Sequence, residues 1–340
     1  MRIQEIADRL GTTARAIRLY EQKGLLQPHK DADNGYRNYT DADVDTLQRI
    51  LAMRELGMSL ATIAGLLSAS ERTEEWAEHL EAARASLYRQ HLAAAQGLLA
   101  LDGVIAALER QSSVPEQAML DAAEHLRESR LLRESWQDRW DYDDVARRME
   151  RVQTGLPLAF PVDDLSESAY EQTLDAVTTQ LAARPGEMGV DLGTGLGNLT
   201  GRLAAAGADI VGIEQSTEML RACRQRYPQL SFRLGNLLAL PLPDHTADFV
   251  ACSFAFHHLT SRQQRLAMQE IGRVLRPDGR LCLAGLTGAV PRDATATDDA
   301  SWYPMDTAGF LTWCAERGLH GECLPATAST VVMIGRPLSV

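Results

Sequence analysis

Residues 190–197 read VDLGTGLG, in which an apolar segment runs into three glycines that alternate with other residues. Glycine lets a backbone approach a ligand closely, because no side chain stands in the way. A glycine-rich turn alone is weak evidence, since dinucleotide-binding folds also carry one. The spacing separates the two cases: here it is G-x-G-x-G after an acidic residue, whereas the dinucleotide fingerprint is G-x-G-x-x-G. The stretch therefore predicts a ligand-binding turn between a strand and a helix.

The sequence around this turn alternates between short apolar segments and helical ones. We expect strands at residues 188–192, 210–214, 230–234, 249–253 and 280–284. Helical segments lie between them, and strand–helix units of this length imply a parallel, doubly wound sheet. In such a sheet the ligand crevice lies at the carboxyl ends of the strands. The predicted fold of this part is α/β and Rossmann-like.

Polar residues stand where that crevice is expected. Glu214 ends the second expected strand, at the spacing of an acid that binds ribose hydroxyls. Asn236 follows the third strand, and His257 and His258 follow the fourth. These side chains should therefore meet at one edge of the sheet.

Residues 165–340 resemble class I methyltransferases at these positions and in three further segments. The segments are LPLPD at 240–244, DFVACSFAFHHL at 248–259 and the stretch from Glu270 to Gly279. The resemblance implies a methyltransferase domain, and S-adenosylmethionine as its cofactor. The alternative is a Rossmann-like domain that has lost its cofactor.

The resemblance also assigns roles to single residues. The methionine end of the cofactor would lie at Asp191, Gly193 and Gly195, and the ribose at Glu214. Asn236 departs from the family, which often has an aspartate there in contact with the adenine amino group. An amide oxygen can accept the same hydrogen bond without charge, so affinity should be modestly weaker. The full predicted cofactor set is Asp191, Gly193, Thr194, Gly195, Gly197, Glu214, Gln215, Asn236, Leu237 and Ser253.

Methyl transfer from a sulfonium is a direct displacement, so the protein mainly has to position the nucleophile. A general base helps only when the acceptor is a hydroxyl or a protonated amine. His257 and His258 are the predicted catalytic residues, as that base or as walls of the pocket; packing is the alternative. Aromatic residues that could close over the cofactor or line an acceptor pocket are Trp136, Trp140, Tyr142, Trp302 and Tyr303. No N-P-P-Y run or catalytic cysteine motif is present, which argues against a DNA methyltransferase.

The first 70 residues follow a different pattern. Apolar residues at helical spacing predict a helix that ends at Gly11, and Thr13 can cap a second helix at residues 14–22. Arg15 and Arg18 lie three apart and share one face of that second helix. A short helix, a tight turn and a second helix form the helix-turn-helix plan, in which the second helix enters the major groove.

Three segments of this region resemble MerR-family transcriptional regulators: IRLYEQKGLL at 17–26, NGYRNY at 34–39 and RELGMSLATI at 54–63. The resemblance implies a winged helix-turn-helix, a homodimer on palindromic promoter DNA, and RNA polymerase as a partner. Leu19 departs from it, since many members have an aromatic residue there. A helical interaction module is the alternative. The predicted DNA-binding residues are Arg15, Arg18, Tyr20, Lys23, Tyr36, Arg37 and Tyr39.

A long helical segment follows, with an apolar seam of nearly heptad spacing. Such a seam predicts a dimeric coiled coil, and one helix of an intrachain bundle is the alternative. The seam consists of Trp76, Leu80, Ala83, Leu87, His91, Ala94, Leu98, Leu101, Ile105 and Leu108.

Composition limits the remaining possibilities. The net charge of −12 argues against nucleic acid for the chain as a whole, but residues 1–40 carry seven basic against five acidic side chains. No apolar run of 18 residues and no secretory signal is evident, which predicts a cytoplasmic protein. The five cysteines form no CxxC pair, and none precedes Cys223, so we expect buried thiols and no metal site.

These observations predict four segments. They are a winged helix-turn-helix at 1–72, a dimerisation helix at 73–112, a helical linker or lid at 113–164 and a methyltransferase domain at 165–340. The predicted function is a DNA-binding transcriptional regulator whose methyltransferase domain acts on or senses a small molecule. The alternative is a regulator whose domain binds S-adenosylmethionine or a drug-like effector without turnover.

Overall fold

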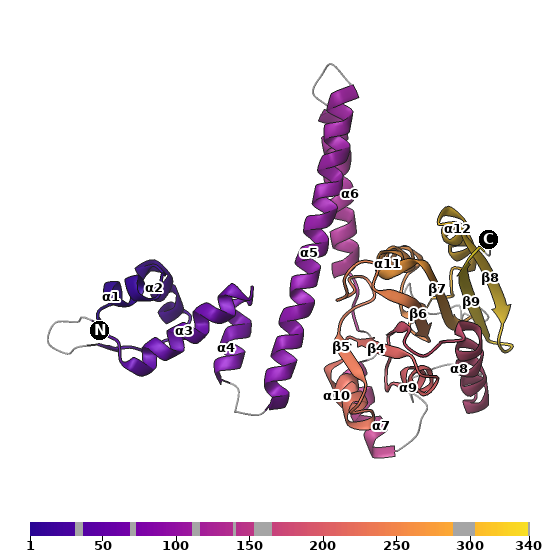
Figure 1. Cartoon of the computed structure of the whole chain (residues 1–340), viewed down its shortest axis with the longest axis horizontal. Helices are drawn as coiled ribbons and strands as arrows, with labels where there is room; N and C mark the ends of the chain where they lie inside the picture. Colours follow the sequence, from indigo (N-terminus) through magenta and orange to yellow (C-terminus); the bar gives the residue numbers. More distant parts are fainter. Residues whose placement is uncertain are drawn as a thin grey trace, which may run out of the picture. The chain divides into compact units, whose positions relative to one another are not determined.

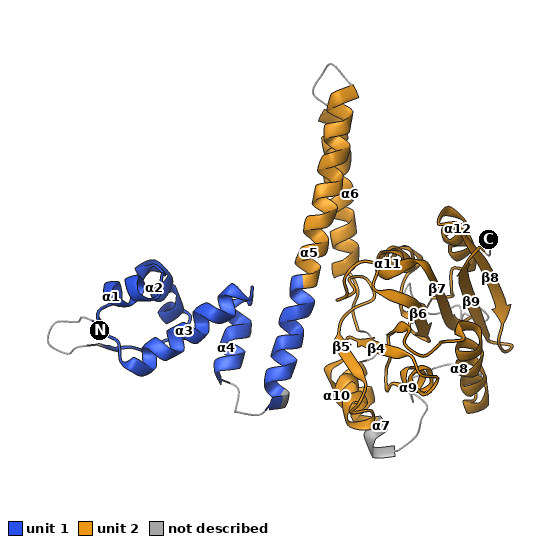
Figure 2. Cartoon of the chain, in the orientation of Figure 1, with its two compact units in different colours: residues 1–87 blue, residues 88–340 orange. Residues whose placement is uncertain are grey.

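The computed structural model describes residues 1–30, 37–68, 73–110, 116–138, 141–152, 165–287 and 303–338. The chain divides into two compact units, Met1–Leu87 and Tyr88–Val340 (Figure 2). One helix, α5 (Thr73–Arg110), continues without a break from the first unit into the second (Figure 1). Each unit has a hydrophobic core of its own.

The first unit begins with the expected pair of short helices. They are α1 (Ile3–Arg9) and α2 (Ala14–Gln22). The hydroxyl oxygen of Thr13 accepts a hydrogen bond from the amide of Ala16 at 3.1 Å, which confirms the predicted cap. The predicted helix at 14–22 is therefore confirmed at both ends.

A two-stranded antiparallel hairpin and two more helices complete this unit. The strands are β1 (His29–Lys30) and β2 (Arg37–Asn38), and the helices are α3 (Asp41–Glu55) and α4 (Leu60–Ser68). Thr40 and Asp43 form a reciprocal capping box at the start of α3. The core lies between the helices, and its fully buried members include Ile6, Ile17, Ile50 and Ile63.

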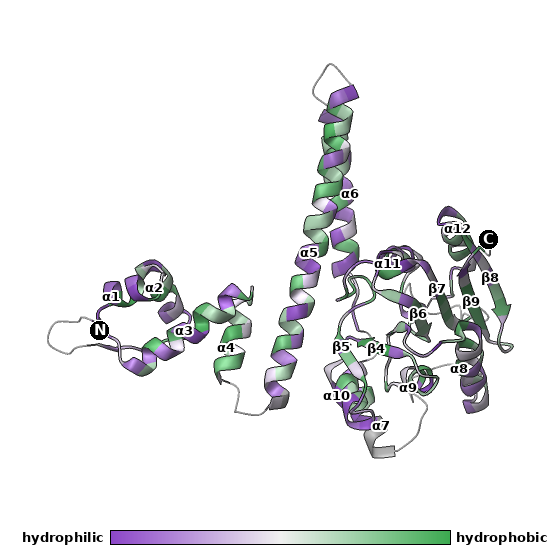
Figure 3. Ribbon diagram, viewed as in Figure 1, coloured by the Kyte–Doolittle hydropathy of each residue, from purple (hydrophilic) through white to green (hydrophobic). Residues whose placement is uncertain are grey.

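Helix α5 is rich in apolar residues, drawn green in Figure 3, and several of them are exposed. The segment Glu75–Arg110 is long and apolar enough to cross a membrane by length and composition, which for a single helix is weak evidence. It also contains two glycines, Gly97 and Gly103, that face open space. Its exposed large apolar side chains, each at least half exposed, are Leu98, Leu99, Leu101, Ile105 and Leu108. An apolar stripe of this kind needs a partner, and the coiled coil remains a prediction.

Two helices lead from α5 toward the sheet. Helix α6 (Glu116–Glu134) runs beside α5, and Nη1 of Arg133 donates to Oε1 of Gln96 at 2.9 Å (Figure 1). A contact of this kind is expected if α5 is one helix of an intrachain bundle, which was the alternative to the coiled coil. Helix α7 (Tyr142–Val152) follows. Residues 153–164, the end of the predicted linker or lid, lie outside the described residues.

A seven-stranded sheet with the order β5-β4-β3-β6-β7-β9-β8 forms the centre of the second unit. Its first five strands in sequence are β3 (Met188–Leu192), β4 (Asp209–Glu214), β5 (Ser231–Leu234), β6 (Ala247–Ser253) and β7 (Leu275–Leu286). All pair in parallel, which confirms the five predicted strands and their relation.

The last two strands correct the predicted all-parallel sheet. Strand β9 (Thr330–Pro337) lies antiparallel between β7 and β8 (Leu319–Pro325). Only four residues separate β8 from β9, and so short a connection allows a hairpin but no crossover helix. The sheet is therefore mixed.

Helices cover both faces of the sheet. One core cluster joins the sheet to α8 (Glu167–Leu181) and α9 (Asn198–Ala205). Another joins it to α11 (Ser261–Val274) and α12 (Thr307–Glu316). Helix α10 (Thr217–Arg226) packs against β5 through a smaller cluster. Because both faces are covered, the open edge for a ligand is the row of strand ends.

Candidate functional site

The glycine turn after β3 has the backbone that only glycine adopts easily. Gly193, Gly195 and Gly197 have φ values of 65°, 55° and 78°. A Cβ atom on Gly193 would lie 2.5 Å from Cβ of Ala255, in the segment after β6. The amides of Gly193 and Thr194 both donate to the carbonyl of Ile213 on β4, at 2.8 and 3.1 Å. The turn is thus fixed against the neighbouring strand, and open space lies beside Gly195, where an added Cβ would meet nothing within 4 Å.

Asp191, on β3 just before the turn, is 1% exposed. Its Oδ2 accepts a hydrogen bond from the hydroxyl of Thr200 at 2.6 Å, and Thr200 also bonds the hydroxyl of Thr194. Burial raises the pKa of Asp191 to about 7. A carboxyl with that pKa titrates near neutral pH, and a nearby cation would favour its charged form.

Glu214 ends β4, and its carboxylate ties the two turns of the site together. Oε2 accepts from the amide of Gly195 at 3.0 Å, and Oε1 accepts from Gln215 and Ser216 at 2.8 and 3.0 Å. Burial raises the pKa of Glu214, while the three amides act in the opposite direction. A carboxylate has about four acceptor positions, so these bonds leave capacity for a ligand hydroxyl.

Asn236 follows β5 and faces the same edge. Its Nδ2 donates to Oε1 of Gln215 at 3.2 Å, and its Oδ1 accepts from the amide of Leu238 at 2.7 Å. The amide thus uses one of its two N–H donors and one of its acceptor positions within the protein, and the others are left for a ligand. Leu237 lies beside Gly193, and Ser253 ends β6. The structure therefore brings the whole predicted cofactor set to one edge of the sheet.

Helix α7 covers part of this edge. The Tyr142 hydroxyl lies 2.5 Å from Nε2 of His258, and the two rings meet edge to face at 5.5 Å. Oδ1 of Asp143 accepts from the Ser216 hydroxyl at 2.6 Å and from the Glu218 amide at 3.3 Å. Side chains of α7 thus touch both the turn after β4 and the turn after β6.

The two candidate catalytic histidines lie in a 3₁₀ turn, η1 (Phe256–His258), after β6. His257 is 2% exposed, and the two ring centres are 4.0 Å apart. Burial lowers the pKa of His258 to about 4 and holds the pKa of His257 well below its usual value. Both rings are neutral at pH 7, and such weak bases are better suited to orient an acceptor than to deprotonate a hydroxyl.

The residues predicted to bind DNA separate into exposed and buried groups. Arg15, Arg18 and Lys23 are exposed on or just after α2. Tyr20 and Tyr39 are 7% and 3% exposed and belong to the core, whereas the predicted role of both in DNA binding would need an exposed ring.

Tyr20 shares the buried face of α2 with Ile17, and Tyr39 is held where the hairpin attaches to α2. The hydroxyl of Tyr39 and Nε of Arg37 both donate to the carboxylate of Glu21. Burial and this carboxylate raise the pKa of Tyr39. Tyr36 lies outside the described residues.

Several residues near the site escaped the sequence reasoning. Asp143, Ser216 and Arg133 contact the strand-end loops, and Nε of Arg133 donates to the carbonyl of Leu238 at 3.0 Å. Ser216 caps α10 through Met219, a local signal that could have been found. No local signal marks Asp143 or Arg133, because their partners are distant in sequence.

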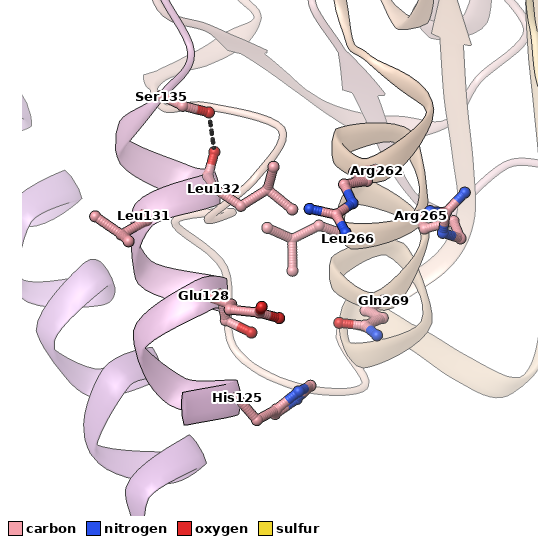
Figure 4. A pocket seen from close by; sticks show the side chains of 10 residues that line it. His125, Glu128, Leu131, Leu132, Ser135, Arg262, Arg265, Leu266 and Gln269 are labelled. Carbon is pink, nitrogen blue, oxygen red and sulfur yellow. Dashed lines mark hydrogen bonds between the residues drawn. The ribbon is translucent and has the colours of Figure 1, made fainter. Parts of the chain in front are cut away.

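A cleft lies between α6 and α11 (Figure 4). Its volume is about 470 Å³. Leu132 and Leu266 point toward each other across it, and Glu128, Arg262 and Gln269 add polar groups (Figure 4). Small-molecule sites have a similar size and mixture of linings.

Both parts of the chain match models of known families. Residues 1–70 match the model of MerR HTH family regulatory proteins, and residues 190–283 match the model of a methyltransferase domain. The chain therefore fuses an N-terminal MerR helix-turn-helix domain to a C-terminal methyltransferase domain, and both predicted resemblances are confirmed. The methyltransferase match supports S-adenosylmethionine as the cofactor, as predicted.

Individual relatives resemble the methyltransferase part. A demethylmenaquinone methyltransferase of Beutenbergia cavernae is 38% identical over 143 residues, which is 42% of this chain and 55% of that protein. An uncharacterized methyltransferase-like protein of Schizosaccharomyces pombe is 33% identical over 36% of this chain and 48% of that protein. The chain thus spans about half the length of these curated relatives.

Solved structures also resemble this part. The magnesium protoporphyrin IX methyltransferase of Synechocystis, with bound S-adenosylhomocysteine, is 19% identical with a TM-score of 0.46, over 56% of this chain and 94% of that one.

Proposed function

We propose that this protein is a dimeric, cytoplasmic DNA-binding transcription regulator whose C-terminal domain binds S-adenosylmethionine and methylates a small molecule. The single observation that carries the cofactor part is the carboxylate of Glu214. It is held at the end of β4 by three backbone amides beside the glycine-rich turn, and it keeps acceptor capacity. One named relative acts on a small molecule, demethylmenaquinone, which supports an acceptor of that size.

The residues of the site would divide the work. Glu214 would accept hydrogen bonds from the ribose hydroxyls, and Asn236 would face the adenine. Bound S-adenosylmethionine supplies an activated methyl group. His258, neutral and bonded to Tyr142, would hold the acceptor in line rather than remove its proton. Catalysis would then rest on position.

The DNA-binding part rests on the first unit and on α5. Arg15, Arg18 and Lys23 offer positive charge on the helix that enters the major groove in this motif. The exposed apolar stripe of α5 would pair with the same stripe of a second copy. RNA polymerase would be the partner at the promoter, by the MerR resemblance.

Calorimetric titration of the full-length protein tests the cofactor site. S-adenosylmethionine and S-adenosylhomocysteine should each bind, and Glu214→Gln should weaken both by about tenfold or more, since hydrogen bonds to a charged group are the strong ones. Glu322→Gln, on an exposed residue of β8, is the matched control. Absence of binding by the unaltered protein would reject the cofactor site.

A second function is favoured by the cleft between α6 and α11. In this version the protein senses an effector there, or senses S-adenosylmethionine itself, and never turns over. The cleft is large enough for a drug-sized ligand, and its lining mixes leucines with both charges. Multiple turnovers of radiolabelled methyl groups onto any small-molecule acceptor would reject this second function.

A further inference from the structure

Arg133 joins the long helix α5 to the loop that follows β5. Its Nη1 donates to Oε1 of Gln96 on α5 at 2.9 Å, and its Nε donates to the carbonyl of Leu238 at 3.0 Å. Burial lowers the pKa of the Arg133 guanidinium, and the nearby Glu270 carboxylate opposes that effect. A half-buried guanidinium is costly unless its N–H groups are bonded, so both contacts matter to its position.

The contact continues from Leu238 into the cofactor site. The amide of Leu238 donates to Oδ1 of Asn236 at 2.7 Å, and Nδ2 of Asn236 donates to Oε1 of Gln215 at 3.2 Å. Gln96, Arg133, Leu238, Asn236 and Gln215 therefore form one chain of four hydrogen bonds. Asn236 joins Leu238 to Gln215 because its amide offers an acceptor to one and a donor to the other.

The far side of this loop is fixed to α11. Oε2 of Glu270 accepts from the amide of Leu240 at 2.9 Å, and Nη2 of Arg273 donates to the Leu240 carbonyl at 3.0 Å. Glu270 and Arg273 also pair with each other. Because Leu240 is held, a movement at Asn236 is more easily passed to Arg133 than absorbed farther along the loop.

We propose that Arg133 is a positioning residue for the cofactor site, and that this hydrogen-bond chain couples cofactor occupancy to helix α5. The inference rests on the proposed binding of S-adenosylmethionine at Asn236 and Glu214. A ligand that occupies the remaining N–H and acceptor positions of the Asn236 amide would hold this side chain in place, and with it Leu238 and Arg133. Such coupling is reciprocal, so a change in α5 alters cofactor affinity by the same factor. Since α5 continues into the first unit, the coupling would give the cofactor a route to the DNA-binding part.

The test uses the full-length protein with S-adenosylhomocysteine as the probe. Calorimetry measures its binding, and hydrogen exchange with mass spectrometry follows the amides of α5 from 88 to 108. Saturating S-adenosylhomocysteine should slow exchange around Gln96. Arg133→Ala should weaken binding by about tenfold and abolish the protection of α5.

Gln96→Ala breaks the chain from the other end and keeps the test open if Arg133→Ala does not fold. It should abolish the protection of α5 while changing affinity by less than about threefold. The controls are Arg130→Ala on α6 and Gln90→Ala on α5, both exposed, which should keep affinity and protection.

The outcomes separate the two proposals. Binding of S-adenosylhomocysteine without any change in α5 exchange would overturn the coupling and leave the cofactor site standing. Protection that survives in both Arg133→Ala and Gln96→Ala would overturn it as well. No binding to the unaltered protein would overturn the cofactor site, and the coupling with it.

Discussion

The Tyr142 hydroxyl and Nε2 of His258 lie 2.5 Å apart although 116 positions separate them in the sequence. Burial raises the pKa of Tyr142 and lowers that of His258 to about 4, so the pair is neutral at pH 7. This bond fixes the start of α7 to the turn after β6, and with it one wall of the site.

We expect Tyr142→Phe to lower the free energy of unfolding by about 0.5–1.5 kcal/mol, the usual contribution of one hydrogen bond. The measurement is urea denaturation of the full-length protein at pH 7. Tyr88→Phe, on α5, is the control for the loss of a hydroxyl. Equal effects of the two substitutions would show that the bond to His258 adds nothing.

Asp191 and His258 should oppose each other in the dependence of stability on pH. The folded-state pKa of Asp191 is raised to about 7, so its contribution is full below the unfolded value and is lost as pH rises through 7. The folded-state pKa of His258 is lowered to about 4, so its contribution is present above its unfolded value and is lost as pH falls toward 4.

Asp191→Asn should therefore remove the contribution of Asp191 to the pH dependence of stability, so that the contribution of His258 remains without its opponent. Between pH 5 and 7 the free energy of unfolding should rise more steeply with pH in the variant than in the unaltered protein, by urea denaturation at several pH values in about that range. Parallel curves would mean that Asp191 does not titrate there.

The same substitution at two glycines should have opposite effects. In Gly193→Ala the new Cβ lies 2.5 Å from Cβ of Ala255, at a φ of 65°, so the free energy of unfolding should fall by about 1–3 kcal/mol. Gly103 is a helical residue at which an added Cβ would meet nothing within 4 Å, so in Gly103→Ala the free energy of unfolding should rise by about 0.5–1 kcal/mol. Thermal unfolding of both variants measures the difference, and a loss at both sites would contradict it.

Dimerisation through α5 is tested by a charge on its exposed stripe. Leu101 is 59% exposed, and Leu101→Lys should convert a dimer into a 37.4 kDa monomer in sedimentation equilibrium. Leu56→Lys is the control, because Leu56 is 63% exposed but lies just after α3. A monomeric unaltered protein, or a dimer in Leu101→Lys, would count against the coiled coil.

The exposed arginines of α2 should dominate binding to non-specific duplex DNA. Arg18→Ala should weaken binding and lower the slope of log affinity against log salt by about one unit, as the loss of one phosphate contact requires. Fluorescence anisotropy with a labelled linear duplex measures both quantities. Arg127→Ala, exposed on α6, should leave them unchanged.

Features set by neighbours in sequence were predicted well. Thr13 caps its helix, and the glycine turn at Gly193 ends β3 where expected, because short-range sterics and hydrogen bonds decide both. The parallel strands were predicted from the alternation of short apolar segments with helical ones.

Features set by distant contacts were not predictable. The antiparallel position of β9 depends on which edge the last hairpin joins. Tyr39 is tied to Glu21, 18 positions away, and no local pattern shows that, whereas Tyr20 shares the buried face of α2 with Ile17. Arg133 bonds Leu238, which lies 105 positions away, so the sequence of α6 does not indicate this contact.

Helix α5 is continuous, but it is not uniformly stiff. Gly97 directly follows Gln96, and Gly103 lies less than two turns farther on. Each glycine weakens a helix by roughly 0.5–1 kcal/mol relative to alanine. Two weak positions of the helix thus lie close to Gln96, the residue that Arg133 bonds, so a change in that bond acts where the helix bends easily.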